Sequence, residues 1–173
     1  MQKTIYRGRV IELTLETVRL PNGAEAELEI IHHPGGAAVV AVDSTRRVCI
    51  LKQFRHAAGG YLWELPAGKI DHREPPLQTA QRELEEEAGH RAGRWDSLGH
   101  YVSSPGVFTE VVHLFLARDL QVATASPEEH EVFETHWRPF GEVLNMAVTG
   151  EISDGKSLVG LFRAAQRFPD LLA

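Results

Sequence analysis

A cluster of acidic residues in the middle of the chain combines residue types and spacings that suit catalysis. Glu86 and Glu87 follow Glu83 by three and four positions. Each residue of an α-helix advances by about 100°, so these three carboxylates would share one helix face. Like charges at these spacings repel by a few tenths of a kcal/mol per pair, so a cation is needed to offset them. Oxygen-rich groups of this kind suit Mg²⁺ or Mn²⁺.

The segment that carries these carboxylates has the signals of a helix from about Pro75 to Ala88. Proline is tolerated in the first helical turn, and Gly89 suits the left-handed residue that follows a helix end. Arg82 can pair with Glu86 one turn later and orient that carboxylate. An adjacent apolar stripe would pack against a sheet, and it consists of Leu77, Ala80, Leu84 and Ala88.

The elements that must hold this helix alternate between strands and helices in no regular order. Partial alternation from Ile5 to Leu20, followed by a turn at Pro21-Asn22-Gly23, predicts an N-terminal hairpin whose second arm is Glu27 to His33. Further strands are expected at 37–42, 48–54, 95–102, 111–117 and 132–137, and further helices at 140–148 and 156–168. This order favours an α+β fold with a mixed sheet. We expect a β extension over residues 1–35 and a catalytic domain over residues 36–173.

The composition limits the classes of function. A chain of 173 residues with 43% hydrophobic and 24% charged residues is long enough to bury a core of its own. Its formal net charge of −6, with no long basic run, gives no general attraction for nucleic acid or anionic lipid, so we expect neither partner. The sequence shows no signal peptide and no apolar run of about 18 residues, which makes the cytoplasm the expected compartment.

The cysteine and histidine content predicts no soft-metal site. Cys49 is the single cysteine and lies in an apolar run, so it is expected to be a buried small hydrophobe. The nine histidines are scattered along the chain, and the adjacent pair His32-His33 is interpreted as a strand end rather than a zinc site.

The spacing around the acidic cluster resembles a known signature, the Nudix box. The segment reads Gly68, five residues, Glu74, seven residues, Arg82-Glu83-Leu84, one residue, Glu86-Glu87, one residue, Gly89. It departs from the signature at its last position, where His90 replaces the usual aliphatic residue. The resemblance implies a Nudix-type α/β/α sandwich with a mixed sheet and an N-terminal β-hairpin extension.

The same resemblance implies roles for individual residues. Glu83 and Glu87 look like metal ligands, together with the backbone carbonyl of Ala67. Glu86 looks catalytic, either as a further ligand or as the supporting carboxylate. Gly68 would let the chain approach the ion closely, because it has no side chain to obstruct that approach. The implied cofactor is Mg²⁺, with Mn²⁺ possible.

Segments outside the box are most similar to the ADP-ribose pyrophosphatase branch of the family. They are Gln53-Phe54-Arg55, Glu64-Leu65-Pro66-Ala67-Gly68, Ser104-Pro105-Gly106 and the nearby Glu110. In the family these segments line the substrate pocket, so Arg55, Glu64, Ser104, Pro105, Gly106 and Glu110 are the expected substrate-binding residues. Arg55 is suited to a fork of hydrogen bonds onto a phosphate oxygen. The stretch from Gly150 to Ser157 resembles the lead-in to the last helix of this branch and is interpreted as scaffold.

An acidic stretch from Pro127 to Val132 resembles the family's catalytic loop. By that resemblance Glu129 is the candidate base and Glu131 a candidate metal ligand. Glu128 is an equally plausible base, and a merely solvated acidic loop is the alternative for the whole stretch.

The resemblance as a whole implies metal-dependent hydrolysis of ADP-ribose to AMP and ribose 5-phosphate. One alternative is another nucleoside diphosphate sugar, such as GDP-mannose, as the substrate. A second alternative is a domain that senses ADP-ribose without cutting it. In this branch the N-terminal strands are often exchanged between two subunits, which implies a homodimer.

Overall fold

Two apolar runs form the central strands of the protein, β4 (Gly36–Ala41) and β5 (Arg47–Arg55). The structure is a computed structural model that describes residues 1–71, 73–126 and 130–172. One sheet has the order β7-β4-β9-β8, and the other has the order β10-β5-β6. The remaining bounds are β6 Gly60–Glu64, β7 Ala67–Lys69, β8 His90–Val102, β9 Val111–Val122 and β10 Phe133–Pro139. β4 and β9 are parallel while the other pairs are antiparallel, so the sheet is mixed as expected.

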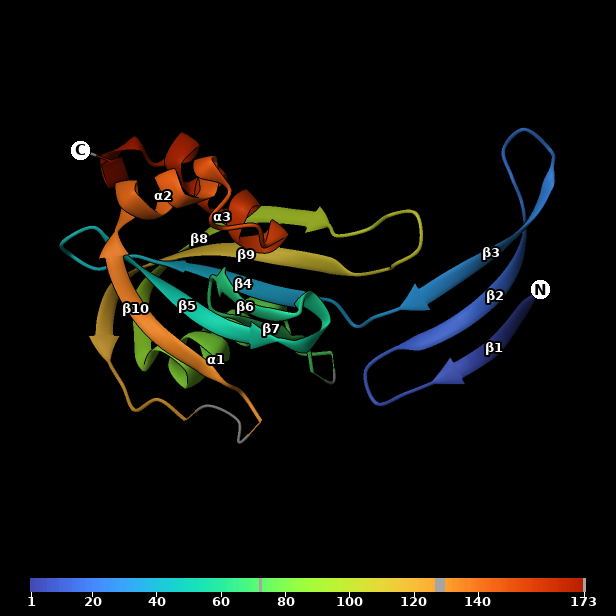
Figure 1. Cartoon of the computed structure of the whole chain (residues 1–173), viewed down its shortest axis with the longest axis horizontal. Helices are drawn as coiled ribbons and strands as arrows, with labels where there is room; N and C mark the ends of the chain where they lie inside the picture. Colours follow the sequence, from blue (N-terminus) through green and yellow to red (C-terminus); the bar gives the residue numbers. More distant parts are fainter. Residues whose placement is uncertain (72, 127–129, 173) are drawn as a thin grey trace.

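Helices cover both faces of these sheets. α1 (Pro76–Ala88) lies on one face, and α2 (Phe140–Thr149) and α3 (Gly155–Arg167) lie on the other (Figure 1). Alternate residues of β4 point to opposite faces, so Val39 joins the core under α1 while Val40 joins the core under α2 and α3. The α/β/α sandwich is therefore confirmed. Short 3₁₀ turns at His56–Ala58 and Pro169–Leu172 complete the described elements.

The ends of α1 match their sequence signals, but its buried face differs from the expected one. Pro76 occupies the first turn, and Gly89 ends the helix in the left-handed region at φ 63°. Leu77 is 36% exposed, whereas Thr79 is fully buried and donates a hydrogen bond to Glu74 at 2.8 Å. The buried face of α1 also includes Glu83 and Glu87, so these two carboxylates pack inside the protein and do not face solvent.

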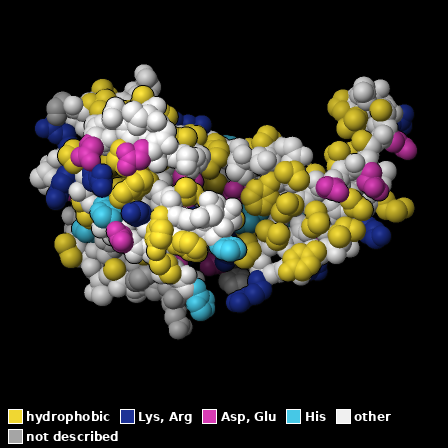
Figure 2. Space-filling model, viewed as in Figure 1, with side chains coloured by type: hydrophobic (Ala, Val, Ile, Leu, Met, Phe, Trp, Pro, Cys, Tyr) yellow, Lys and Arg dark blue, Asp and Glu magenta, His cyan; other side chains and the backbone are white. Residues whose placement is uncertain are grey.

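The N-terminal region is a three-stranded antiparallel sheet of β1 (Gln2–Arg7), β2 (Glu12–Arg19) and β3 (Glu25–His32). The predicted two-armed hairpin was incomplete, because the first arm is itself divided by a turn around Gly8. This sheet extends away from the helix-covered body (Figure 1) and carries hydrophobic side chains on its surface (Figure 2). Its last strand meets the β8–β9 loop, where the Ile31 N–H donates to the Val107 carbonyl at 2.7 Å.

Other differences from the sequence expectations concern strand boundaries. β8 begins at His90, directly after α1, because the chain turns at Gly89 without an intervening loop. The short strands β6 and β7 were not predicted, since three to five residues give little periodic signal. Cys49 is buried as expected. Among the helices in the described ranges, none is long and apolar enough to cross a bilayer.

Candidate active site

The carboxylate of Glu83 packs directly against the backbone of Gly68. A methyl group built on Gly68 would lie 1.8 Å from Glu83 Oε1, so a larger residue there would force this carboxylate to move. Burial, reinforced by the charge of Glu86, raises the pKa of Glu83 to about 7, although Arg82 opposes the shift. The Glu83 carboxylate takes the space beside Gly68, so the expected approach of an ion to this backbone stays a prediction.

Glu87 is the most deeply buried carboxylate of the cluster. Its Oε2 atom accepts a hydrogen bond from the Ala67 N–H at 2.8 Å. Its Oε1 atom is buried and has no hydrogen-bond partner among the described residues. Burial, followed by the charge of Glu83, raises the pKa of Glu87 well above its usual value. A buried oxygen without a partner is costly, so it marks a place where a ligand is expected.

Arg82 holds the remaining carboxylate and offsets part of the negative charge. It donates to Glu86 at 2.9 Å, as expected from the i, i+4 spacing, and also to Glu83 at 2.7 Å. A third bond reaches the Lys69 carbonyl at 3.2 Å and ties α1 to the end of β7. Glu86 is therefore a half-buried carboxylate fixed by a guanidinium beside the two buried ones.

This arrangement fits a hard divalent cation in its chemistry. Its donors are carboxylate oxygens, one of them lacks a partner, and Gly68 leaves the backbone of β7 open beside them. Within the described residues no three acidic, histidine or cysteine side chains converge as a closed metal site. Arg82 occupies one oxygen each of Glu83 and Glu86, so a bound cation would share these carboxylates with it.

A cleft of about 360 Å³ opens next to the cluster and brings together residues from distant parts of the chain. Ala67, Gly68 and Glu131 line it, and Arg55 and Lys156 supply positive charge. The negative charge of Glu131 helps to raise the pKa of both Glu83 and Glu87, so this carboxylate lies near the other two. The remaining lining residues are His33, Gly36, Ala37, Lys69, Glu110 and Val112.

Two of the cleft cations, Arg55 and Lys156, share one buried carboxylate, that of Glu64, which is 2% exposed. Arg55 donates to Glu64 in a fork, with Nε at 2.9 Å and Nη2 at 2.8 Å. Lys156 donates to the same carboxylate and also lies 3.1 Å from Asp154. Burial opposes ionisation of Glu64, but Arg55 and Lys156 outweigh it and lower its pKa. In this arrangement Glu64 holds the two cations in place and does not itself line the cleft.

Other expected site residues are placed less directly. Glu110 lines the cleft and lies 3.4 Å from His33. Ser104, Pro105 and Gly106 lie in the loop between β8 and β9 and are not among the lining residues. Both candidate bases, Glu128 and Glu129, lie outside the described residues, so their roles stay predictions.

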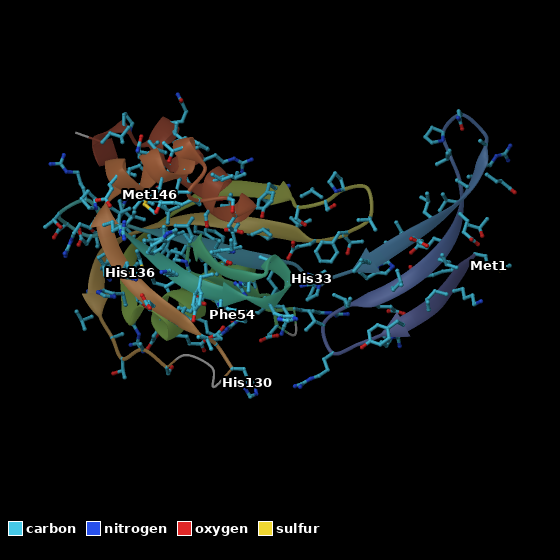
Figure 3. The ribbon with its side chains drawn as sticks, viewed as in Figure 1. Met1, His33, Phe54, His130, His136 and Met146 are labelled. Atoms are coloured by element: carbon cyan, nitrogen blue, oxygen red, sulfur yellow. The ribbon has the colours of Figure 1, made fainter. Side chains whose placement is uncertain are left out.

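Sequence reasoning missed Lys156 and His33. Lys156 was interpreted as scaffold, but the first turn of α3 places it in the cleft. The next residue, Ser157, accepts a hydrogen bond from the Leu65 N–H at 2.7 Å and so ties α3 to the segment between β6 and β7. His33 lies where the chain passes from β3 into β4, at the junction of the N-terminal sheet and the body (Figure 3). The motif that contains Lys156 was interpreted only as scaffold, and His33 carries no motif signal, so only their tertiary neighbours reveal their place in the cleft.

Comparison with known proteins agrees with this geometry. The model of the family described as NUDIX domain matches residues 32–158. The chain is 38% identical to an ADP-ribose pyrophosphatase of Bacillus subtilis (strain 168), over 90% of this chain and 85% of that protein. It is 35% identical to an ADP-ribose pyrophosphatase of Mycobacterium tuberculosis (strain ATCC 25618 / H37Rv), over 92% of this chain and 78% of that protein. A crystal structure of an ADP compounds hydrolase has the same fold, with a TM-score of 0.84, 19% identity and coverage of 98% and 92% of the two chains.

The chain therefore belongs to the Nudix family and is an enzyme of the pyrophosphohydrolase type that this family comprises. The departure at His90 does not disturb the helix exit. The imidazole donates to the Ala88 carbonyl at 2.6 Å and packs edge-on against Trp137, with ring centres 4.9 Å apart.

The raised pKa of Glu83 gives a prediction for the metal-free protein. The group is protonated up to about pH 7 in the folded chain but only to about 4.5 when unfolded, so stability falls as pH rises through that window. We expect Glu83→Gln to raise the free energy of unfolding by roughly 2 kcal/mol at pH 8 and by little at pH 4.5. Denaturant unfolding with a chelator present measures this difference. A variant less stable than wild type at pH 8 would contradict the assignment of Glu83 as a desolvated charge.

The shared carboxylate at Glu64 gives a second prediction. Glu64→Gln leaves Arg55 and Lys156 side by side without their anion, so we expect a loss of about 3 kcal/mol in unfolding free energy and a higher KM. Glu134→Gln is the matched control, since Glu134 pairs with His136 on the surface, and its effect should stay within about 0.5 kcal/mol. Equal stability and equal KM in the Glu64 variant and wild type would show that this carboxylate does not organise the cleft.

Proposed function

We propose that this protein hydrolyses the pyrophosphate bond of ADP-ribose and releases AMP and ribose 5-phosphate. The observation that carries the proposal is the cleft beside the buried carboxylates of Glu83 and Glu87, because carboxylates and cations line it together. The lining carboxylates are Glu110 and Glu131, and the lining cations are Arg55, Lys69 and Lys156. A diphosphate bridge needs both, because cations must neutralise it while a water molecule is directed at one phosphorus. The two ADP-ribose pyrophosphatases that resemble this chain over most of its length support the choice of substrate.

The proposed cofactor is Mg²⁺, held by Glu83, Glu87 and the Ala67 carbonyl, with Glu131 as a further ligand and Glu86 in support. When bound, such ions offset the charge of the diphosphate and make a nearby water more acidic. Arg55 and Lys156 would contact phosphate oxygens from the opposite side of the cleft, fixed by their shared partner Glu64. Glu110 reaches the same cleft and would position the ribose end of the substrate.

The proposed base is Glu129, which would take the proton from the attacking water. In the sequence Glu129 stands two positions before Glu131, a residue that lines the cleft. A base that approaches only when substrate is bound limits idle hydrolysis. Glu128 is the alternative for this role.

The substrate proposal is tested by incubating the purified protein and Mg²⁺ with ADP-ribose, GDP-mannose and other nucleoside diphosphate sugars. We expect the highest kcat/KM for ADP-ribose, with AMP and ribose 5-phosphate as the products. A preference for GDP-mannose, with release of GMP, would replace the proposed substrate by its alternative. Binding of ADP-ribose without any product would instead favour a sensing domain.

Two variants in the same assay separate the metal ligands from the base. Glu87→Gln should lower turnover by roughly a hundredfold or more and weaken Mg²⁺ binding. Glu129→Gln should slow the chemical step while Mg²⁺ binding stays unchanged. If Glu129→Gln is fully active and Glu128→Gln is not, the base is Glu128.

We further propose that the protein is a homodimer that uses its N-terminal sheet, residues 1–35, as the dimerisation element. This sheet extends from the body and exposes Ile5, Tyr6, Val10 and Leu28 (Figure 2). A small sheet gains stability when a partner covers such apolar side chains.

Size-exclusion chromatography with light scattering tests this proposal. We expect wild type at twice the chain mass of 19.3 kDa, and Ile5→Asp shifted toward the monomer because a charge replaces buried apolar surface. Wild type that elutes as a monomer at micromolar concentration would overturn the proposal.

A further inference from the structure

Two histidines on neighbouring strands of the β8–β9 hairpin face each other. His100 on β8 is the direct antiparallel partner of His113 on β9. Their rings are 5.7 Å apart between centroids and are tilted by 47°. Directly opposed residues of neighbouring strands point to the same face of a sheet, so both imidazoles lie on one side of the hairpin.

The strand register places the histidine pair level with Gly68 of the candidate active site. His113 is the partner of Ala37 on β4, and Ala37 is in turn the partner of Gly68 on β7. Neighbouring strands are about 4.8 Å apart, so the backbone of His113 lies about 10 Å from Gly68, on the sheet face that α1 covers farther along. The histidine pair is therefore a neighbour of the acidic cluster but not a part of it.

The imidazole nitrogens of this pair are available to a ligand. His100 is exposed and His113 is half-buried. Within the described ranges neither ring has a hydrogen-bond or ion-pair partner, and the contact between the rings is the interaction they share. Two imidazoles gain little from such a contact alone, whereas an ion between them would bond to both.

The spacing of the rings suits one transition-metal ion. Metal–nitrogen bonds to histidine are about 2.0–2.1 Å long, so small side-chain rotations let rings 5.7 Å apart bond the same ion. Imidazole selects Zn²⁺, Cu²⁺ or Ni²⁺, while Mg²⁺ prefers oxygen ligands. The chemistry of this pair therefore differs from that of the carboxylate cluster.

We propose that His100 and His113 form a binding site for a transition-metal ion, separate from the catalytic cation site, with water completing the coordination. This inference does not depend on the proposed substrate. It concerns a pair of ligands that hairpin register creates, since the two residues belong to no sequence motif.

Isothermal titration of the full-length protein with Zn²⁺ tests the site, in excess Mg²⁺ that competes for oxygen ligands and has little affinity for imidazole. We expect one Zn²⁺ binding event per chain that is lost in both His100→Gln and His113→Gln. His136→Gln is the matched control, since His136 is also a half-buried histidine on a strand, and it should keep the event. Thermal melting confirms that each variant is folded, which is expected because His100 lies on the surface.

Electron paramagnetic resonance of the Cu²⁺-loaded protein identifies the ligands directly. Coupling to two imidazole nitrogens in wild type, and loss of this two-nitrogen coupling in each pair variant, is the expected result. Zn²⁺ binding that is unchanged in both pair variants, or absent from wild type, would overturn the proposal. Neither outcome bears on ADP-ribose hydrolysis, so failure here and failure of the proposed function are distinguishable.

Discussion

The contact between the Glu83 carboxylate and the Gly68 backbone is the constraint on which the candidate site depends. It brings α1 so close to β7 that a single methyl group on Gly68 would collide with the carboxylate. At this distance Glu83 and Glu87 are buried together, and burial raises the pKa of both. Ionisation of these buried carboxylates therefore destabilises the metal-free fold, and a bound cation would offset that repulsion. The same carboxylates on α1 that suit cation binding thus lower the stability of the protein without a cation.

Elsewhere at the cleft a buried carboxylate is matched by two cations. There a buried anion, Glu64, gathers the cations Arg55 and Lys156 from β5 and from the start of α3. The hydrogen bond between Leu65 and Ser157 fixes α3 to the segment that joins β6 to β7. A diphosphate in this cleft would face cations held by protein on one side and carboxylates able to hold metal on the other. The geometry accounts for a pyrophosphate bond as the target better than for either half of the substrate alone.

The sequence predicted the parts of the fold that have strong local signals. The central strands, the three helices and the left-handed residue Gly89 follow from apolar periodicity and from glycine and proline chemistry. The short strands β6 and β7 and the division of the first N-terminal arm were not predictable, because they depend on pairing with distant segments. Leu77 shows the same limit, since a helical wheel gives the apolar stripe but not how far the sheet reaches beneath it.

By itself, the sequence determined the acidic helix, its glycine partner and the family, because these are fixed by residue types at short spacings within 23 residues. Only the tertiary structure decided that Glu64 serves Arg55 and Lys156, that His33 borders the cleft and that His100 faces His113. These relations join residues that are 9 to 92 positions apart. Sheet register and helix packing set such distances, and neither leaves a local pattern in the chain.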